Sequence, residues 1–115
     1  MPHRATRRTL HSIAAQAGGG AAPTFVGATS AGGYSTSVTC AVPGDVIDGD
    51  IMIAAFDVYV SGRTVTQPDG WDVVLTEALI TVYSRVASSE PANYTWLRDG
   101  AANNIAALIT AYRGS

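Results

Sequence analysis

Three aspartates near the middle of the 115-residue chain form the clearest pattern with possible chemistry. Asp45, Asp48 and Asp50 have the spacing D-x-x-D-G-D. Converging carboxylates are the oxygen ligands that Ca²⁺ prefers, but this spacing differs from that of the EF-hand loop and no matching Glu follows. The alternative is a turn in which the Asp side chains accept hydrogen bonds from local backbone N–H groups, with Gly49 at a positive φ. The sequence leaves both interpretations open and assigns no metal.

Catalytic groups of the common hydrolase types are poorly placed. Acidic side chains offer carboxylate pairs of the kind that glycosidases use, but a chain this short cannot build a deep substrate cleft. A Ser-His-Asp arrangement would need His3 or His11, which both lie near the N-terminus. The lone Cys40 is expected to be a small buried hydrophobic residue, and one Cys with two His cannot build a closed zinc site. We expect no enzymatic activity, no catalytic residue and no cofactor; the acids considered are Asp57, Asp69, Asp72, Glu77 and Glu90.

Aromatic side chains offer a second kind of chemistry, because their ring faces can stack on sugars. The residues considered first for a glycan or protein interface are Trp71, Tyr59 and Tyr34. Aromatic residues at strand spacing more often belong to a core. Trp71 follows the turn sequence Pro68-Asp69-Gly70, so the alternative is that it folds back over the end of a sandwich.

Charge is unevenly distributed along the chain. Residues 1–44 contain Arg4, Arg7 and Arg8 and no acid, whereas residues 45–115 contain four Arg and nine acids. A basic arm on an acidic body suggests that the arm binds an acidic surface; the alternative is a solvated terminus. Three arginines are too few to indicate nucleic-acid binding.

The first 22 residues are expected to form this arm. Thr9 to Ala17 places Leu10, Ile13, Ala14 and Ala17 on one face of a short helix, and Gly18-Gly19-Gly20 provides a hinge. We expect partner binding through Arg4, Arg7, Arg8, Leu10 and Ile13, and a domain that starts near Pro23.

From residue 23 onward the pattern predicts an all-β domain. Gly32-Gly33, Pro43-Gly44-Asp45 and Asp99-Gly100 are typical of turns, and Ser61-Gly62-Arg63 is typical of a hairpin. About eight short strands with turns at this spacing indicate an antiparallel sandwich, jelly-roll-like in form. Ala101 to Ala107 could be helical, but its β-branched neighbours favour a strand. The predicted strands are 24–29, 37–42, 50–60, 63–66, 71–76, 78–87, 93–97 and 104–112.

The composition is compatible with one small domain and with no membrane span. The hydrophobic fraction of 47% argues against wholesale disorder. No apolar run approaches the ~20 residues that a membrane helix needs. Alternation along the strands predicts a core of Phe25, Val38, Cys40, Ile51, Ile53, Phe56, Val74, Ile80, Val82, Val86, Trp96, Ile105 and Ile109.

Four segments taken together in this order resemble a β-sandwich domain of tailed-bacteriophage structural proteins. They are VPGDVIDGDIMI at 42–53, PDGW at 68–71, the VYSRVA and EPANYTW pair within 82–96, and AYRG at 111–114. The resemblance covers residues 24–114. It carries over no catalytic residue, because the family's members are virion proteins of the tail, fibre or capsid surface. Arg85 and Glu90 bracket a hairpin in this pattern and are expected to pair across it.

The resemblance implies a virion localisation and a structural function. Adhesins are expected to keep long variable loops, and this chain has short ones, which favours a capsid decoration or cement protein. Its expected partners are the major capsid protein or other virion proteins, bound through the arm and a sandwich edge. A homo-oligomer is expected, with a trimer by analogy to threefold capsid positions. The alternative function is a tail or tail-fibre module that binds a host-surface glycan.

Overall fold

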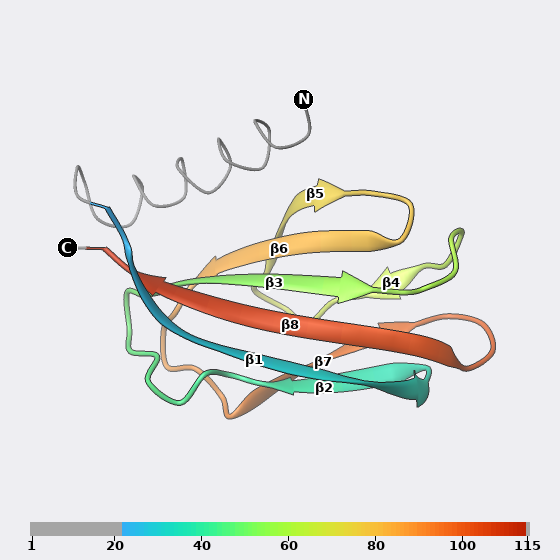
Figure 1. The fold of residues 1–115 in the computed structure, drawn as a ribbon, viewed down its shortest axis with the longest axis horizontal. Coiled ribbons are helices and arrows are strands. Elements are labelled where there is room, and N and C mark those ends of the chain that lie inside the picture. Colours follow the sequence, from blue (N-terminus) through green and yellow to red (C-terminus); the bar gives the residue numbers. More distant parts are fainter. Residues whose placement is uncertain (1–21, 115) are drawn as a thin grey trace.

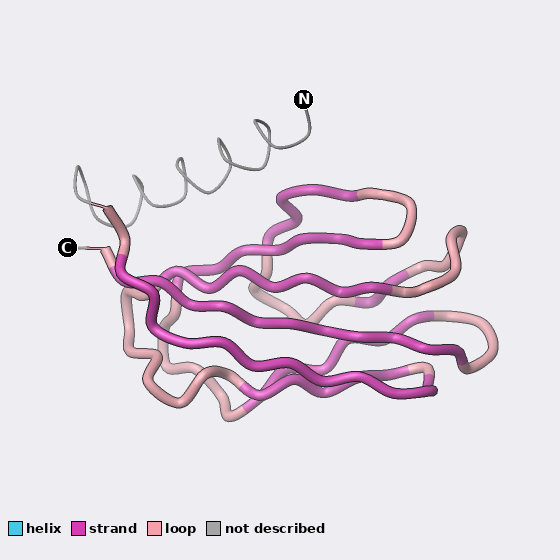
Figure 2. The backbone as a smooth tube through the Cα atoms, in the orientation of Figure 1, coloured by secondary structure: helices cyan, strands magenta, loops and turns pink. Residues whose placement is uncertain are grey.

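The protein is an all-β sandwich of eight antiparallel strands, as predicted from the sequence (Figures 1 and 2). The computed structural model describes residues 22–114, and within that range it contains no helix that could cross a membrane. The predicted arm residues Arg4, Arg7, Arg8, Leu10 and Ile13 lie outside the described residues. The strands are β1 Thr24–Ser35, β2 Ser37–Ala41, β3 Ile51–Asp57, β4 Val65–Thr66, β5 Asp72–Thr76, β6 Ile80–Val86, β7 Asn93–Arg98 and β8 Asn103–Arg113.

The strands form two sheets whose pairing is nested along the chain. The larger sheet has the order β1-β8-β3-β6-β5 and the smaller one β2-β7-β4. Strand β1 therefore pairs with β8, β2 with β7 and β3 with β6, as if one long hairpin had been folded over. This nesting is that of a jelly roll. The innermost pair is missing, because β5 pairs with β6 and β4 pairs with β7.

Alternating side chains from both sheets fill the space between them. In β7 every second residue is buried, which places Tyr94, Trp96 and Arg98 on the inner face. Phe56, Tyr83 and Ile109 meet them from the larger sheet, and all three are almost completely buried. The predicted core positions Val38, Cys40, Ile51, Phe56, Trp96, Ile105 and Ile109 are indeed buried.

The predicted turn at Gly32-Gly33 is wrong, because β1 continues through both glycines to Ser35. They pair with Ala106 and Ile105 of β8, and neither has a positive φ. A Cβ on Gly32 would lie 3.0 Å from the Ile105 carbonyl oxygen, so the glycine allows close approach of two strands. The chain changes sheets instead at Thr36, between β1 and β2.

The predicted inner face of β6 is also wrong. Ile80 and Val86 are exposed, Val82 is half-buried, and Tyr83 is the residue that enters the core. Alternation favours the face of Ile80, Val82 and Val86, but the strand turns the opposite face, which carries Tyr83 between Thr81 and Arg85, toward the core. A shift of one residue reverses every side chain of a strand. Phe25, on the edge strand β1, is exposed as well and packs edge-on against Tyr112.

The turn at Ser61-Gly62-Arg63 exists, with Gly62 at a φ of 81°, but it does not close a hairpin. It joins β3 of the larger sheet to β4 of the smaller sheet. The predicted strand at 50–60 ends at Asp57, and β4 contains two residues only. By contrast, the predicted strand over 104–112 is confirmed, since β8 runs from Asn103 to Arg113.

Candidate functional site

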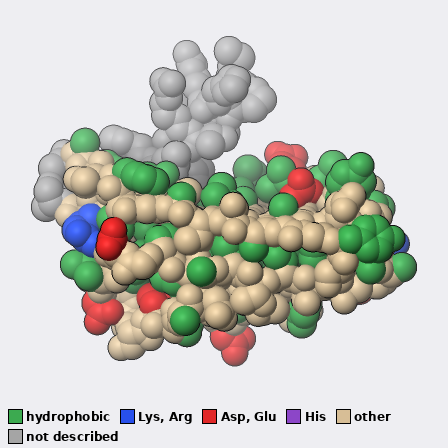
Figure 3. Space-filling model, turned by 60° about the horizontal axis from the view of Figure 1, so that its bottom comes forward, with side chains coloured by type: hydrophobic (Ala, Val, Ile, Leu, Met, Phe, Trp, Pro, Cys, Tyr) green, Lys and Arg blue, Asp and Glu red, His purple; other side chains and the backbone are tan. Residues whose placement is uncertain are grey.

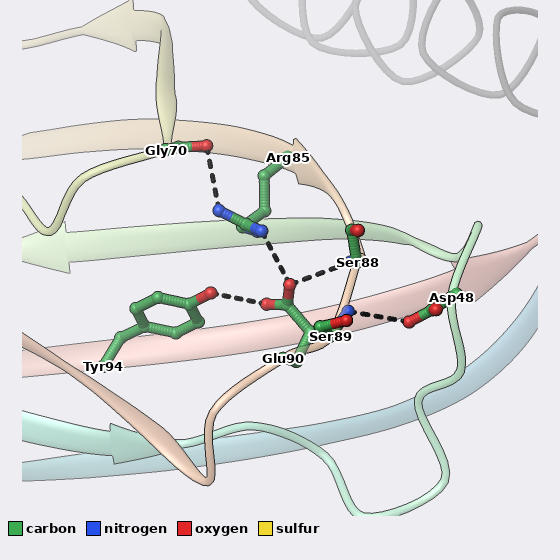
Figure 4. A network of polar contacts seen from close by, with 7 residues as sticks. All are labelled: Asp48, Gly70, Arg85, Ser88, Ser89, Glu90 and Tyr94. Carbon is green, nitrogen blue, oxygen red and sulfur yellow. Dashed lines mark hydrogen bonds and ion pairs between the residues drawn. The ribbon is translucent and has the colours of Figure 1, made fainter.

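Three connections between strands meet at one end of the sandwich, around the carboxylate of Glu90 (Figure 4). Glu90 lies in the connection between β6 and β7. Its Oε2 accepts a 2.7 Å bond from Arg85 Nη2 and a 3.0 Å bond from the Ser88 backbone N–H. Its Oε1 accepts a 2.6 Å bond from the Tyr94 hydroxyl. The expected pairing of Arg85 with Glu90 is confirmed, and Tyr94 is a third member that the spacing did not reveal.

Arg85 connects this carboxylate to the turn before β5. Its Nη1 donates to the Gly70 carbonyl oxygen at 3.2 Å, and its guanidinium carbon lies 5.7 Å from the centre of the Tyr94 ring. Gly70 has a φ of 88°, and a Cβ there would lie 2.3 Å from Arg85 Nη1. Glycine is therefore required at this turn both by its backbone conformation and by the arginine that packs on it.

Aromatic rings continue the cluster into the core. Trp71 meets Tyr94 edge-on with ring centres 5.2 Å apart, and Trp96 lies 5.6 Å from Trp71 and 6.0 Å from Tyr83. Trp71 is 3% exposed. The alternative interpretation, in which Trp71 folds over the end of the sandwich, is therefore confirmed. The prediction that Trp71 stacks on a glycan is wrong, because protein covers its ring faces.

The titration behaviour of Tyr94 fits a structural hydrogen-bond donor. Burial, then the hydrogen bond to Glu90 and the negative charge of Glu90, raise the pKa of Tyr94 to about 12, although Arg85 opposes the shift. Burial likewise raises the pKa of Tyr83. A phenol that keeps its proton at neutral pH donates to the carboxylate and does not act as a base.

The three aspartates do not converge on one point. Asp50 is buried and accepts bonds from Arg113 Nε at 2.8 Å, Arg113 Nη2 at 2.9 Å and the Ile47 backbone N–H at 2.9 Å. Asp48 accepts a bond from the Ser89 backbone N–H at 2.8 Å. Within residues 22–114 no three His, Cys, Asp or Glu side chains form a group that could hold a metal ion. Asp50 accepts a hydrogen bond from the local backbone, as the turn interpretation predicts. Asp48 instead links the connection between β2 and β3 to the connection between β6 and β7.

The Arg113 side chain sets the electrostatics of Asp50. Its hydrogen bonds lower the pKa of Asp50 against the opposing effect of burial, and the same bonds raise the pKa of Arg113. Arg113 Nη2 also donates to the Asp45 carbonyl oxygen at 3.0 Å. An aspartate held by a bidentate arginine has its oxygens occupied, so it serves the fold rather than a ligand.

Tyr34 and Tyr59 remain available to solvent at the opposite end of the sandwich. Tyr34 is 71% and Tyr59 60% exposed. Tyr59 has a φ of 66°, and it lines a small hollow of about 90 Å³ together with Asp57 and Asn104. Asn104 pairs with Tyr34 across β1 and β8. The structure therefore places two of the three predicted interface aromatics at the same end of the sandwich, on either side of β8, with Asp57 and Asn104 beside Tyr59.

Two further groups complete the chemical inventory of the described residues. Cys40 is fully buried, as expected, with Sγ near Thr29 Oγ1 at 3.5 Å and the Ala107 carbonyl oxygen at 3.9 Å. Arg98, which no sequence motif marks, is 4% exposed. Its three guanidinium nitrogens find no hydrogen-bond partner among residues 22–114. The alternation of β7 could have identified it, because it places Arg98 on the same face as Tyr94 and Trp96.

No protein-family model, curated protein or solved structure matches the chain.

Proposed function

We propose that this protein is a non-enzymatic structural component of a tailed-phage virion, and specifically a capsid decoration or cement protein. The observation that supports this proposal is the cluster around Glu90. The residues on which the resemblance rests, Gly70, Trp71, Arg85, Glu90 and Tyr94, contact one another and stabilise the fold. In a family of structural domains, the residues of the sequence pattern are expected to be those that pack together. In an enzyme family, the pattern would instead contain reactive groups at an open cleft.

The proposed binding surfaces are the arm, residues 1–22, and an edge of the sandwich. Arg4, Arg7 and Arg8 give the arm its positive charge, and the partner is the major capsid protein or another virion protein. Edge strands such as β5 and β2 present unpaired backbone groups to which an extended segment can add. Homo-oligomerisation, as a trimer at threefold capsid positions, belongs to the same proposal.

The test is to purify particles of the phage or prophage that encodes the chain and to locate the protein in a cryo-electron-microscopy map. Density for the sandwich on the capsid exterior is the expected result. Absence from purified particles would contradict the virion assignment altogether, and density in the tail would replace the capsid role by a tail role.

A binding measurement tests the arm separately. Arg4→Ala, Arg7→Ala and Arg8→Ala together are expected to weaken rebinding to particles at least ~10-fold, since each lost ion contact removes favourable charge interaction. The matched control makes the same change of −3 in net charge on exposed turns of the body, through Ser61→Glu, Ala78→Glu and Ala101→Glu. Equal weakening by both variants would show that net charge, and not the arm, determines binding.

The second candidate function is a tail or tail-fibre module that binds a host glycan, and one observation favours it. Exposed Tyr59 lies beside Asp57 and Asn104 in the small hollow, and sugars are recognised by ring stacking combined with polar hydrogen bonds. Tyr59→Ala should abolish binding on a glycan array if this function is right. The control is Leu97→Ala, which removes an exposed apolar side chain from β7.

A further inference from the structure

The four arginines of the described residues divide into two kinds by their place in the sandwich. Arg85 and Arg113, at the end where β3 begins, each bind a carboxylate. Arg63 and Arg98, at the opposite end, form no ion pair within residues 22–114. All nine acidic residues of the chain lie between positions 45 and 99, so each of them belongs to the described part. The chain therefore leaves two arginines at one end without a carboxylate.

The acids at this end hold the local backbone instead. Asp57 Oδ1 accepts a 2.8 Å bond from the Tyr59 backbone N–H. Asp99 Oδ1 accepts a 2.9 Å bond from the Thr64 backbone N–H. Both carboxylates thus fix the shape of connections, and neither neutralises an arginine.

The two arginines lie beside the same short stretch of chain. Strand β4 pairs with the end of β7, and the pairing continues through a 3.0 Å bond from the Asp99 N–H to the Thr64 carbonyl oxygen. Arg63, which precedes Thr64, packs over Gly100, where a Cβ would lie 2.1 Å from Arg63 Nη1. Arg98 belongs to the same stretch, two residues before Gly100. The arrangement places two positive charges at this end with no acid between them.

Arg98 is the buried member of this pair, and Arg63 is the exposed one. All three guanidinium nitrogens of Arg98 lack a hydrogen-bond partner among the described residues. Buried charges in proteins are normally paired, and a group left unpaired needs an explanation. In Figure 3 basic and acidic side chains lie side by side at the end where β3 begins, whereas the basic atoms visible at the other end lie next to hydrophobic side chains.

We propose that this end of the sandwich binds an acidic segment of a partner protein, whose carboxylates pair with Arg98 and Arg63. A carboxylate matches the fork of a guanidinium, as Asp50 does here with Arg113 Nε at 2.8 Å and Nη2 at 2.9 Å. Two separate guanidinium groups call for two carboxylates. A protein segment that carries both satisfies the two arginines together, whereas a small acid with one carboxylate satisfies one.

The buried guanidinium reaches such a partner from the end of its strand. Arg98 is the last residue of β7, and its backbone is fixed by a 2.9 Å bond from its N–H to the Thr36 carbonyl oxygen. Its side chain has no corresponding bond within residues 22–114 that holds it inside. Rotation about its side-chain torsions carries the guanidinium toward the partner, and a paired cation replaces an unpaired buried one. Arg98 thus lowers the stability of the free protein and contributes to the affinity of the complex.

The inference goes beyond the proposed function and does not depend on it. The surfaces proposed above are the arm and a sandwich edge, and this one is an end of the sandwich. It identifies the partner by its acidic chemistry, whether or not that partner belongs to a virion.

Nuclear magnetic resonance of the arginine Nε–H groups in the full chain tests the proposal. The probe is the peptide acetyl-Glu-Ala-Glu-amide, and its Gln-Ala-Gln counterpart is the uncharged control. We expect saturable shifts of the Arg98 and Arg63 signals with the Glu peptide, and small ones for Arg85 and Arg113. Acetate should need at least a ~10-fold higher concentration for half-saturation, because its carboxylates are not linked. An unmoved Arg98 signal, equal shifts with the Gln peptide, or equal affinity for acetate would overturn the proposal.

Three variants connect peptide binding to particular residues. Arg98→Met should weaken binding at least ~10-fold while its Tm stays equal to wild type or rises. Arg63→Gln, at an exposed position, should weaken binding by only ~2–5-fold, since exposed ion pairs contribute little. Ala92→Glu makes the same change of −1 in net charge on an exposed residue at the opposite end, and should change affinity less than about 2-fold. Equal weakening by Ala92→Glu and Arg98→Met, or unchanged binding in Arg98→Met, would overturn the proposal.

Discussion

The two ends of the sandwich differ in whether their arginine side chains have carboxylate acceptors. At the end where β3 and β7 begin, which we call the paired end, Arg113 binds the buried Asp50 and Arg85 binds Glu90. At the end where β7 finishes, Arg98 is more deeply buried than either and has no hydrogen-bond partner among the described residues. A buried guanidinium is therefore a stabilising element here only where a turn delivers a carboxylate to it.

The sharpest test of the paired end is Glu90→Ala. It leaves the Arg85 guanidinium and the Tyr94 hydroxyl without their acceptor, and uncompensated buried groups of this kind cost about 3–5 kcal/mol of unfolding free energy. Urea denaturation followed by tryptophan fluorescence measures the loss. Glu77→Ala, in an exposed turn, is the control and should change stability by less than about 0.5 kcal/mol. A similar small effect for Glu90→Ala would remove the distinction between the two ends.

Arg98→Met should change stability in the opposite direction. It replaces a buried cation that lacks a partner by an apolar side chain of similar length, so we expect stabilisation by about 1–4 kcal/mol. Thermal unfolding monitored by circular dichroism gives the sign directly. The matched variant Arg85→Met should destabilise. If Arg98→Met also destabilises, Arg98 has an acceptor in solution and the comparison fails.

The Asp50–Arg113 pair should make the paired end sensitive to acid. Arginine lowers the folded-state pKa of Asp50, so the pair contributes fully above the unfolded pKa and its contribution disappears as pH falls through the folded pKa. Asp50→Asn should cost about 1–2 kcal/mol at pH 7, because Arg113 is partly exposed and screened by solvent. Urea denaturation at pH 7 and at pH 2.5 should show the difference between wild type and variant shrinking in acid. A difference that stays constant with pH would contradict the assignment.

The smallest expected effect is that of Tyr94→Phe, which keeps the ring and removes one hydrogen bond. We expect a loss of about 1 kcal/mol. Spectrophotometric titration adds a specific signature, because the wild-type protein should show a phenol that ionises only near pH 12 and the variant should lack it. Persistence of that late component in Tyr94→Phe would assign it to another tyrosine.

Much of the fold follows from local sequence patterns. Turn residues and the alternation of apolar and polar side chains predicted the all-β class and most of the strands. Both signals depend only on neighbours along the chain. The errors arose where a choice depended on distant strands. The sequence predicts a turn at Gly32 because it does not show that β8 passes beside it. The aliphatic face of β6 was predicted to be inside, but Tyr83 on the other face is the residue that packs against Trp96 of the opposite sheet.

The candidate site was predictable only in part, for the same reason. The spacing of Arg85 and Glu90 suggested their pairing, because the two residues bracket one hairpin. Asp50 and Arg113 are separated by 63 positions, and only the nested strand order brings them together. The exposed pair Tyr34 and Tyr59 was foreseen by residue type, whereas the burial of Trp71 depends on Tyr94 and Trp96.

The nested pairing of the strands also determines when the fold can form. In the larger sheet β8 lies between β1 and β3, so those two strands have no shared neighbour until residues 103–113 exist. During synthesis on a ribosome, the emerging chain can form the hairpin of β5 and β6 but cannot close its main sheet. Contacts between distant segments also slow folding in general, to milliseconds or seconds in all-β domains. Until residues 103–113 have left the ribosome, β1 lacks its partner in the larger sheet and β3 has only β6 beside it, so this sheet is completed only after β8 emerges.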